Sequence, residues 1–277
     1  MLQENVTNIP LLHRESVAVG SRSTHEVVPV GADISSPASY LIAKRALDIA
    51  ASFTVLLLTS PLLILVAVLI RVTSPGPIIY RQRRVGEGGR IFTMLKFRSM
   101  YHNADPHLHQ QAYTRFVRGT AGNGKVDRET LADLAPDALR MCVPESYIHR
   151  PFKRLWWHIK RVLSADDPRI TPIGAIIRRA SIDELPQLFN VLIGDMSLVG
   201  PRPPIPYEVR LYSQHHLGRL AVTPGITGIW QVYGRNRVPF DHMVDMDLEY
   251  IAHRSFWLDL WLLILTVPAV VSMRSGE

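Results

Sequence analysis

Two adjacent carboxylates in the stretch RRASIDELPQLFNVL could hold a divalent cation, or one of them could attack a phosphorus atom. These residues are Asp183 and Glu184, and they follow Arg178 and Arg179 closely in the chain. Arginines neutralise phosphate oxygens, and phosphoryl transfer depends mostly on positioning and charge neutralisation. These residue types at this spacing are therefore typical of a phosphoryl-transfer site.

Further cations could complete such a site. Lys96 and Arg98 share one face of IFTMLKFRSM, whose alternating apolar and polar positions predict a short strand. Arg202 lies in the later motif GDMSLVGPRP. For each arginine alone a surface position remains the alternative, and the basic cluster Arg81, Arg83 and Arg84 is typical of lipid headgroup binding.

The local alternative is that the two acids merely open a helix. An i, i+3, i+4, i+7, i+8 pattern predicts an amphipathic helix over residues 186–193, packed on a core and ended by Gly194. Its apolar positions are Leu185, Leu188, Phe189, Leu192 and Ile193. Ser181 and Glu184 match a capping box, but Pro186 would then lack a needed N–H. If Asp183 is the N-cap instead, Pro186 falls in the first turn of the helix, where a backbone N–H has no intrahelical partner and its absence costs nothing. Local rules therefore leave Asp183 as either a helix cap or a residue that takes part in the chemistry.

A long apolar stretch, residues 46–70, must anchor these elements to a membrane. At about 1.5 Å per residue it is long enough for a hydrocarbon core of about 30 Å. The pair Ser60-Pro61 lies near its middle, where proline removes a hydrogen bond and the serine hydroxyl can satisfy the freed carbonyl. Basic residues, which prefer the cytoplasmic side, flank both ends. The residues thus permit either a kinked crossing or a re-entrant hairpin.

The second apolar stretch, residues 255–273, is short for a crossing. Its tryptophans, Trp257 and Trp261, are four positions apart on one helical face, which favours an interfacial helix. A core helix of a soluble domain is the alternative.

The positive net charge favours an anionic partner, and the single cysteine fits a reducing compartment. The formal charge of +7 and the isoelectric point near 9.7 favour nucleic acid, lipid headgroups or a phosphorylated substrate. The neighbouring membrane segment makes lipid a simpler explanation than nucleic acid. The single cysteine, Cys142, cannot form an intrachain disulfide, which fits the cytoplasm.

Four segments together resemble a known family. SPGPIIYRQRRVG, FTMLKFRSM, DPRITPIGAIIRRASIDELPQLFNVLIGDMSLVGPRP and TPGITGIWQVYGR are similar to the bacterial sugar transferases, which are monotopic polyprenyl-phosphate glycosyl-1-phosphate transferases. The resemblance runs from about residue 44 to residue 273. Its most specific block is DELPQL followed by GDMSLVGPRP.

The resemblance implies an activity and a location. Such enzymes move a sugar 1-phosphate from a UDP-sugar to undecaprenyl phosphate, release UMP and use Mg²⁺, which starts exopolysaccharide, capsule or O-antigen synthesis. Glucose and galactose are the sugars we expect. The reaction takes place at the cytoplasmic face of the bacterial inner membrane. The partners are then the two substrates and the lipid bilayer, with no nucleic acid, and a homodimer is compatible with this.

The resemblance also assigns roles to residues. Asp183 would attack the phosphate bonded to the sugar and form a covalent phosphosugar-enzyme, and Glu184 would support the metal. The membrane helix would break at Ser60 and Pro61 and re-enter. The substrate-binding positions would be Lys96, Arg98, Arg178, Arg202, Thr223 and Gly225. Two alternatives stay open: direct transfer in a single step, with the dyad as metal ligands only, and a non-catalytic membrane adaptor.

We therefore expect an α+β, mainly helical fold, in which a small cytoplasmic catalytic domain is held on a re-entrant membrane helix with interfacial amphipathic helices. Residues 1–40 would be a flexible polar tail, residues 41–73 the membrane helix and residues 74–277 the catalytic domain. Within that domain we expect an insertion at about 101–166 and the interfacial helix at about 255–273. The insertion and the tail depart from the compact family pattern, which leaves the sugar unassigned.

Overall fold

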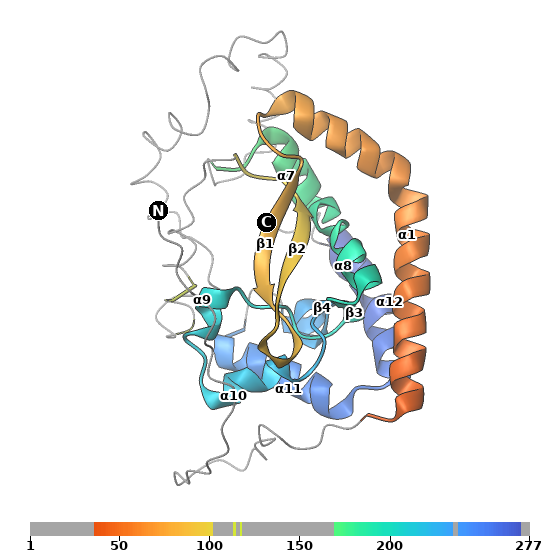
Figure 1. The fold of residues 1–277 in the computed structure, drawn as a ribbon, viewed down its shortest axis with the longest axis vertical. Coiled ribbons are helices and arrows are strands. Elements are labelled where there is room, and N and C mark those ends of the chain that lie inside the picture. The colour runs from red at the N-terminus through yellow and green to blue at the C-terminus, as the bar shows by residue number, and fades with distance from the viewer. Residues whose placement is uncertain (1–35, 102–112, 115–116, 118–168, 235–237, 273–277) are drawn as a thin grey trace.

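One long apolar helix and a group of shorter elements make up the structure, a computed structural model that describes residues 36–101, 113–114, 117, 169–234 and 238–272 (Figure 1). The α-helices are α1 (Ala38–Thr73), α7 (Pro172–Arg179), α8 (Gln187–Ile193), α9 (Pro206–Val209), α10 (Gln214–Leu217), α11 (Phe240–His253) and α12 (Phe256–Ser272). Short turns of other helix are η1 (Glu87–Gly89), η2 (Ile182–Glu184), η3 (Gly218–Ala221) and η4 (Trp230–Gly234). The strands are β1 (Ile79–Val85), β2 (Ile91–Phe97), β3 (Ser197–Val199) and β4 (Gly225–Thr227). The described part is thus mainly helical α+β, as the sequence predicts.

The strands form two separate pairs. β1 and β2 make an antiparallel hairpin, and its register places Tyr80 opposite Lys96. β3 and β4 are parallel, with Ser197 opposite Gly225. The alternation of IFTMLKFRSM therefore predicted β2 correctly.

α1 presents one face to the protein and another to its surroundings. Its buried side chains recur about every four residues, and they are Tyr40, Asp48, Ser52, Leu56, Val66 and Ile70. Leucine, isoleucine, valine and phenylalanine on the other face are exposed, among them Phe53, Leu58 and Ile64. α1 is also the one described helix that is long and apolar enough to cross a membrane. An exposed apolar face of this size is compatible with a membrane anchor.

Pro61 lies within α1 without ending it. Proline cannot donate to the carbonyl four residues before it, which is that of Leu57. The Ser60 hydroxyl donates to this same oxygen at 2.8 Å, so the local prediction for the Ser-Pro pair is confirmed. Figure 1 shows that α1 bends, so that its C-terminal part leans over the end of the hairpin where β1 begins.

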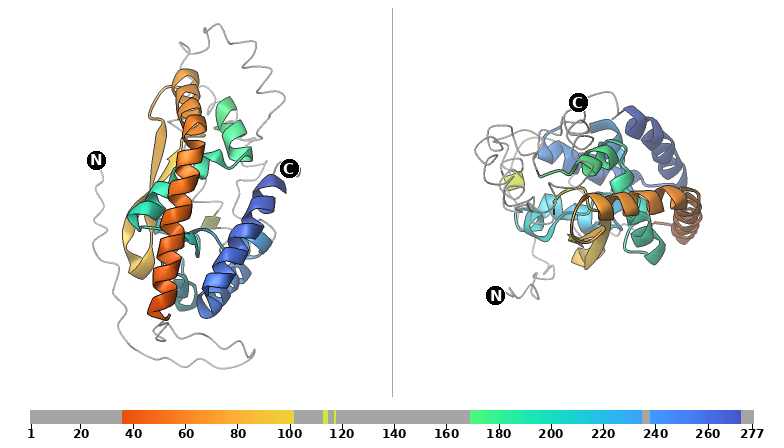
Figure 2. Two further views of the ribbon diagram at one scale, coloured as in Figure 1. Left: turned by 90° about the vertical axis from the view of Figure 1, so that its right-hand side faces the viewer. Right: turned by 90° about the horizontal axis from the view of Figure 1, so that it is seen from above.

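Polar side chains fix the first turns of α1 to the rest of the protein. Lys44 forms a partly buried ion pair with Asp259 of α12 at 2.9 Å, and both Tyr40 and Tyr250 donate to the same carboxylate. Arg45 donates to the Val191 and Leu192 carbonyls at the end of α8, at 2.6 and 2.7 Å. Figure 2 shows α12 running beside this half of α1. The acid in the second apolar stretch is therefore a structural ion-pair partner.

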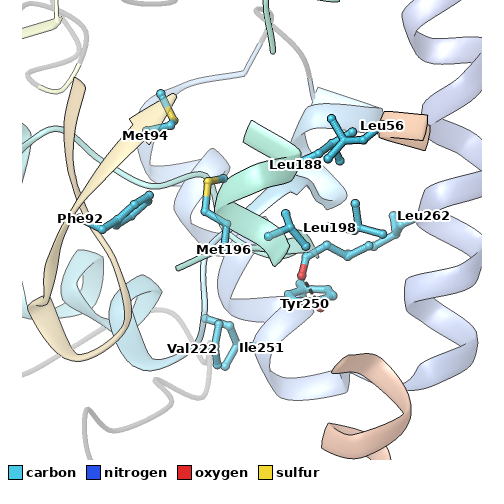
Figure 3. Packing of buried hydrophobic residues seen from close by; sticks show 12 residues of the cluster. Leu56, Phe92, Met94, Leu188, Met196, Leu198, Val222, Tyr250, Ile251 and Leu262 are labelled. Carbon is cyan, nitrogen blue, oxygen red and sulfur yellow. Dashed lines mark hydrogen bonds between the residues drawn. The ribbon is translucent and has the colours of Figure 1, made fainter. Parts of the chain in front are cut away.

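The main core lies between α1, β2, α8 and α12 (Figure 3). Its buried members include Leu56 from α1, Met94 from β2, Val191 from α8 and Leu262 from α12. A second cluster joins Val66 and Ile70 of α1 to Phe97 and Ile177. α1 is thus part of the hydrophobic core of the protein and not merely a tether.

The prediction for α8 needs correction. Phe189 and Ile193 of α8 are 48% and 72% exposed, so the apolar face predicted to pack on a core does so only in part. α12 buries Leu262 and exposes Trp257 and Trp261, so the core and surface readings of this segment each describe one of its faces. The predicted insertion at about 101–166, apart from residues 101, 113–114 and 117, and the tail before residue 36 lie outside the described residues.

Candidate active site

The two acids lie in a short 3-10 turn, η2, that joins α7 to α8. The chain leaves α7 and passes through Ser181 at φ 53°, a left-handed conformation that costs a residue with a side chain about 1–3 kcal/mol. Asp183 is buried within this turn, and α8 begins only after Pro186, which occupies its N-cap position. The interpretation of Asp183 as the cap of α8 is therefore wrong. Gly194 ends α8 in the left-handed conformation, as predicted.

Two cations approach the carboxylate of Glu184. Lys96 Nζ donates to Glu184 Oε1 at 2.7 Å, and Arg202 Nη2 lies 3.8 Å from the same oxygen. Lys96 comes from β2, and Arg202 from the turn after β3. Residues far apart in sequence thus meet at the start of α8, as the phosphoryl-transfer hypothesis requires.

The dyad is electrostatically asymmetric. Burial and the neighbouring charge of Glu184 raise the pKa of Asp183 to about 6, in spite of Lys96 and Arg178 nearby. Burial also opposes the charge on Glu184, but Lys96 and Arg202 outweigh it and lower the pKa of Glu184 to about 2. Glu184 is therefore a fixed anion at neutral pH. Asp183 is an ionised carboxylate with more basicity than usual, which suits a nucleophile.

A buried asparagine sets the distance between Lys96 and the dyad. Asn190 of α8 is 2% exposed, accepts from Leu95 N at 3.0 Å and donates to the Thr93 carbonyl at 2.7 Å. Its amide therefore holds the backbone of β2 on both sides of Met94, just before Lys96. Sequence reasoning missed this residue, because a polar position in an amphipathic helix does not reveal its partner.

Arg84 is a second residue that sequence reasoning placed elsewhere. It is buried, and its Nη1 donates to the Pro203 carbonyl at 2.8 Å, beside Arg202. Burial and the charge of Arg202 lower its pKa to about 10, so it remains a cation. Its assignment to lipid headgroups is therefore wrong for this member of the basic cluster. The alternation of β1 could have separated Arg84 from Arg81 and Arg83.

Arg219 supports the turn that carries Arg202. Its Nη2 donates to the Arg202 carbonyl at 3.4 Å, and its Nε donates to Asp247 Oδ2 at 2.7 Å. Both members of this ion pair are buried, and Tyr212 OH also accepts from Arg219. The backbone of Arg202 is therefore attached to α11 through a buried ion pair.

The structure brings together five of the predicted site residues, namely Asp183, Glu184, Lys96, Arg178 and Arg202. The other three have different surroundings. Arg98 donates to the Ser74 and Pro75 carbonyls at the end of α1. Thr223 donates to Glu87 at the hairpin tip, and Gly225 packs so closely on Gly200 that a side chain would collide with backbone.

The donor set is compatible with magnesium. Among the described residues there is no group of three or more His, Cys, Asp or Glu side chains, so Asp183 and Glu184 would be the protein ligands. Mg²⁺ commonly takes one or two carboxylates and completes its shell with water and substrate phosphates. Mutual repulsion contributes to the raised pKa of Asp183, and a cation between the two acids would relieve it.

Comparisons with known proteins agree on one family. A family model described as bacterial sugar transferase matches residues 39–273. Exopolysaccharide production protein ExoY of Rhizobium meliloti is 36% identical over 85% of this chain and 88% of its own length. The undecaprenyl-phosphate galactose phosphotransferase of Salmonella typhimurium is 38% identical over 84% of this chain and 41% of its own. The UDP-glucose:undecaprenyl-phosphate glucose-1-phosphate transferase of Xanthomonas campestris is 32% identical over 96% of this chain and 46% of its own.

Proposed function

The chain belongs to the bacterial sugar transferase family, and on that basis we propose that it transfers a sugar 1-phosphate from a UDP-sugar to undecaprenyl phosphate and releases UMP. It is an enzyme of the polyprenyl-phosphate hexose-1-phosphate transferase type. Glucose and galactose are the sugars in the names of its relatives, so we propose one of them as the cargo. The step would initiate exopolysaccharide or O-antigen assembly.

One observation carries the proposal: a buried aspartate stands beside a glutamate that Lys96 and Arg202 hold in place. An adaptor that binds anionic lipid needs surface cations but no buried carboxylate with a raised pKa. A phosphotransferase needs both the nucleophile and the cations, because charge on the phosphate oxygens must be neutralised as the bonds change.

The chemistry follows in two displacements. A carboxylate oxygen of Asp183 attacks the phosphorus that bears the sugar, and the bond from that phosphorus to the bridging oxygen breaks, so UMP leaves with the electron pair. An oxygen of undecaprenyl phosphate then attacks the same phosphorus and releases Asp183 as a carboxylate. Lys96, Arg202 and Arg178 neutralise the phosphate oxygens, and Glu184 positions Lys96. Mg²⁺, when bound by the dyad, would supply further charge neutralisation.

Contacts at both ends of α1 support a re-entrant membrane helix. Lys44 and Arg45 bond to α12 and α8 near its start, and Arg98 bonds to Ser74 and Pro75 just after its end. Hydrogen bonds from one domain to both ends of α1 favour an arrangement in which both ends lie on the same side of the bilayer. The basic residues at both ends favour the cytoplasmic side. We therefore propose that the domain lies at the cytoplasmic face of the inner membrane.

The topology can be tested with single cysteines at the two ends of α1. In a Cys142→Ser background, Ser39→Cys and Thr73→Cys place small thiols at exposed positions. Both should react with an impermeant thiol reagent in inside-out vesicles and neither in intact cells. If one of them reacts only from outside the cell and the other only from inside, α1 crosses the membrane and re-entry is wrong.

The activity can be tested with purified full-length protein, undecaprenyl phosphate and Mg²⁺. UMP release should appear with UDP-glucose or UDP-galactose and should require both the lipid phosphate and the metal for sustained turnover. UDP-sugar alone should label the protein with phosphosugar. Turnover without any phosphosugar label would favour direct single-step transfer. If no UDP-sugar yields UMP, the remaining hypothesis is the non-catalytic membrane adaptor.

A further inference from the structure

A half-exposed tyrosine lies next to the cations of the active site. Tyr80 of β1 is 50% exposed and is directly opposite Lys96 in the hairpin register. Directly opposed residues of an antiparallel pair point to the same face, with Cβ atoms about 4.5–5.5 Å apart. Because Lys96 reaches Glu184 from this face, the Tyr80 ring adjoins the group of side chains that would hold the diphosphate.

A second tyrosine lies on the neighbouring element. Tyr207 belongs to α9, which packs against β1. The segment before α9 is bonded to β1 by Val85 N to the Pro204 carbonyl at 2.9 Å and by Arg84 to the Pro203 carbonyl. The Tyr207 ring makes an edge contact with the ring of Tyr113, with ring centroids 6.3 Å apart. A second tyrosine thus lies on the helix that packs against β1.

The proposed donor has one part that the dyad and the cations do not match. Its diphosphate suits Lys96 and Arg202, but uracil is a flat, uncharged ring one ribose away from the phosphate. A base of this kind stacks on an exposed aromatic side chain, which contributes about 1–3 kcal/mol. Tyr80 meets this need, since it is exposed and lies one side chain from Lys96.

We propose that Tyr80 is the stacking surface for the uracil base of the donor and of the UMP product. The inference rests on the proposed function, because it names how that site holds its nucleotide. Tyr80 would bind both before and after the transfer and would take no part in the bond changes. Its removal should therefore weaken nucleotide binding far more than it slows the chemical step.

The test compares UMP binding by calorimetry with full-length protein in detergent and Mg²⁺. Tyr80→Ala should raise the Kd for UMP about 10-fold, the loss of about 1.4 kcal/mol of stacking. The KM for UDP-sugar should rise by a similar factor, with kcat nearly unchanged. Tyr80→Phe keeps the ring and should bind UMP like the wild type. Tyr233→Ala, which removes an exposed tyrosine near α12, is the matched control and should also have no effect.

Three outcomes would overturn the inference. One is an unchanged Kd for UMP in Tyr80→Ala. Another is an equal loss for inorganic phosphate as competitor, since phosphate has no base to stack. A third is weaker binding of UDP-sugar but not of UMP, which would assign Tyr80 to the sugar. If the wild type binds UMP through Tyr80 yet never releases it from a UDP-sugar, the base site stands and the proposed transfer fails.

Discussion

Asp183→Asn should abolish turnover, lowering UMP release by at least about 10³-fold, because an amide cannot form the covalent phosphosugar intermediate that we propose. The fold should survive, since asparagine has nearly the same size. The wild-type carboxylate is buried beside Glu184 with a raised pKa, so its charge is disfavoured in the folded protein. The variant should therefore melt at the same temperature as the wild type or slightly higher.

Trapping of the covalent intermediate tests the role of Asp183 most directly. With UDP-sugar alone, the wild type should acquire a phosphosugar label and Asp183→Asn should acquire none. Asp195→Asn changes an acid that pairs with the exposed Arg90, and it should retain both label and turnover. An Asp183→Asn enzyme that turns over near the wild-type rate would exclude Asp183 as the nucleophile.

Arg219→Met should destabilise the protein by about 3–5 kcal/mol, because it leaves the carboxylate of Asp247 buried at 1% exposure without its ion-pair partner. The melting temperature in detergent measures this loss. Activity should fall as well, with a raised KM for UDP-sugar, since Arg219 also bonds to the Arg202 carbonyl. Arg90→Met removes an exposed ion pair and should cost no more than about 1 kcal/mol.

The stability loss caused by Arg219→Met should grow as the pH rises. Burial raises the pKa of Asp247 to about 6 even beside Arg219, and removal of the cation raises it further. An acid whose folded pKa exceeds its unfolded pKa binds more protons in the folded state, so stability falls as pH rises through that interval. The deficit of Arg219→Met should therefore be larger at pH 8 than at pH 6. The double variant Arg219→Met, Asp247→Leu should recover stability relative to Arg219→Met. If Arg219→Met alone loses no more stability than Arg90→Met, the prediction is refuted.

Local patterns in the sequence predicted those elements that local forces determine. The apolar length of α1, the alternation in β2 and the stop at Gly194 each depend on residues within one element. The Ser60 hydroxyl also behaves as predicted, because its acceptor is three residues away on the same helix. The membership in a family followed from whole motifs and not from any one of these elements.

The parts that could not be predicted depend on contacts between distant segments. Arg98 and Arg84 are both basic residues of the hairpin, but only the docking of the turn after β3 decides that Arg84 lies beside Arg202. Helical period predicted an apolar face on α8 without showing that Phe189 and Ile193 would remain exposed. The helical periodicity of apolar residues predicts that one face is apolar, but it does not predict whether protein or lipid covers that face.

The packing of α1 into the core has a consequence for kinetics. Leu56 is buried in one cluster with α8 and β2, and Ile70 in a second cluster with Phe97 and Ile177. If α1 lies in the membrane, the elements that carry the candidate site therefore cannot leave the membrane without it. Enzyme and polyprenyl acceptor would then meet by lateral diffusion in two dimensions. The rate would depend on the mole fraction of acceptor among the surrounding lipids, and diluting it with inert lipid at constant bulk concentration would slow the reaction.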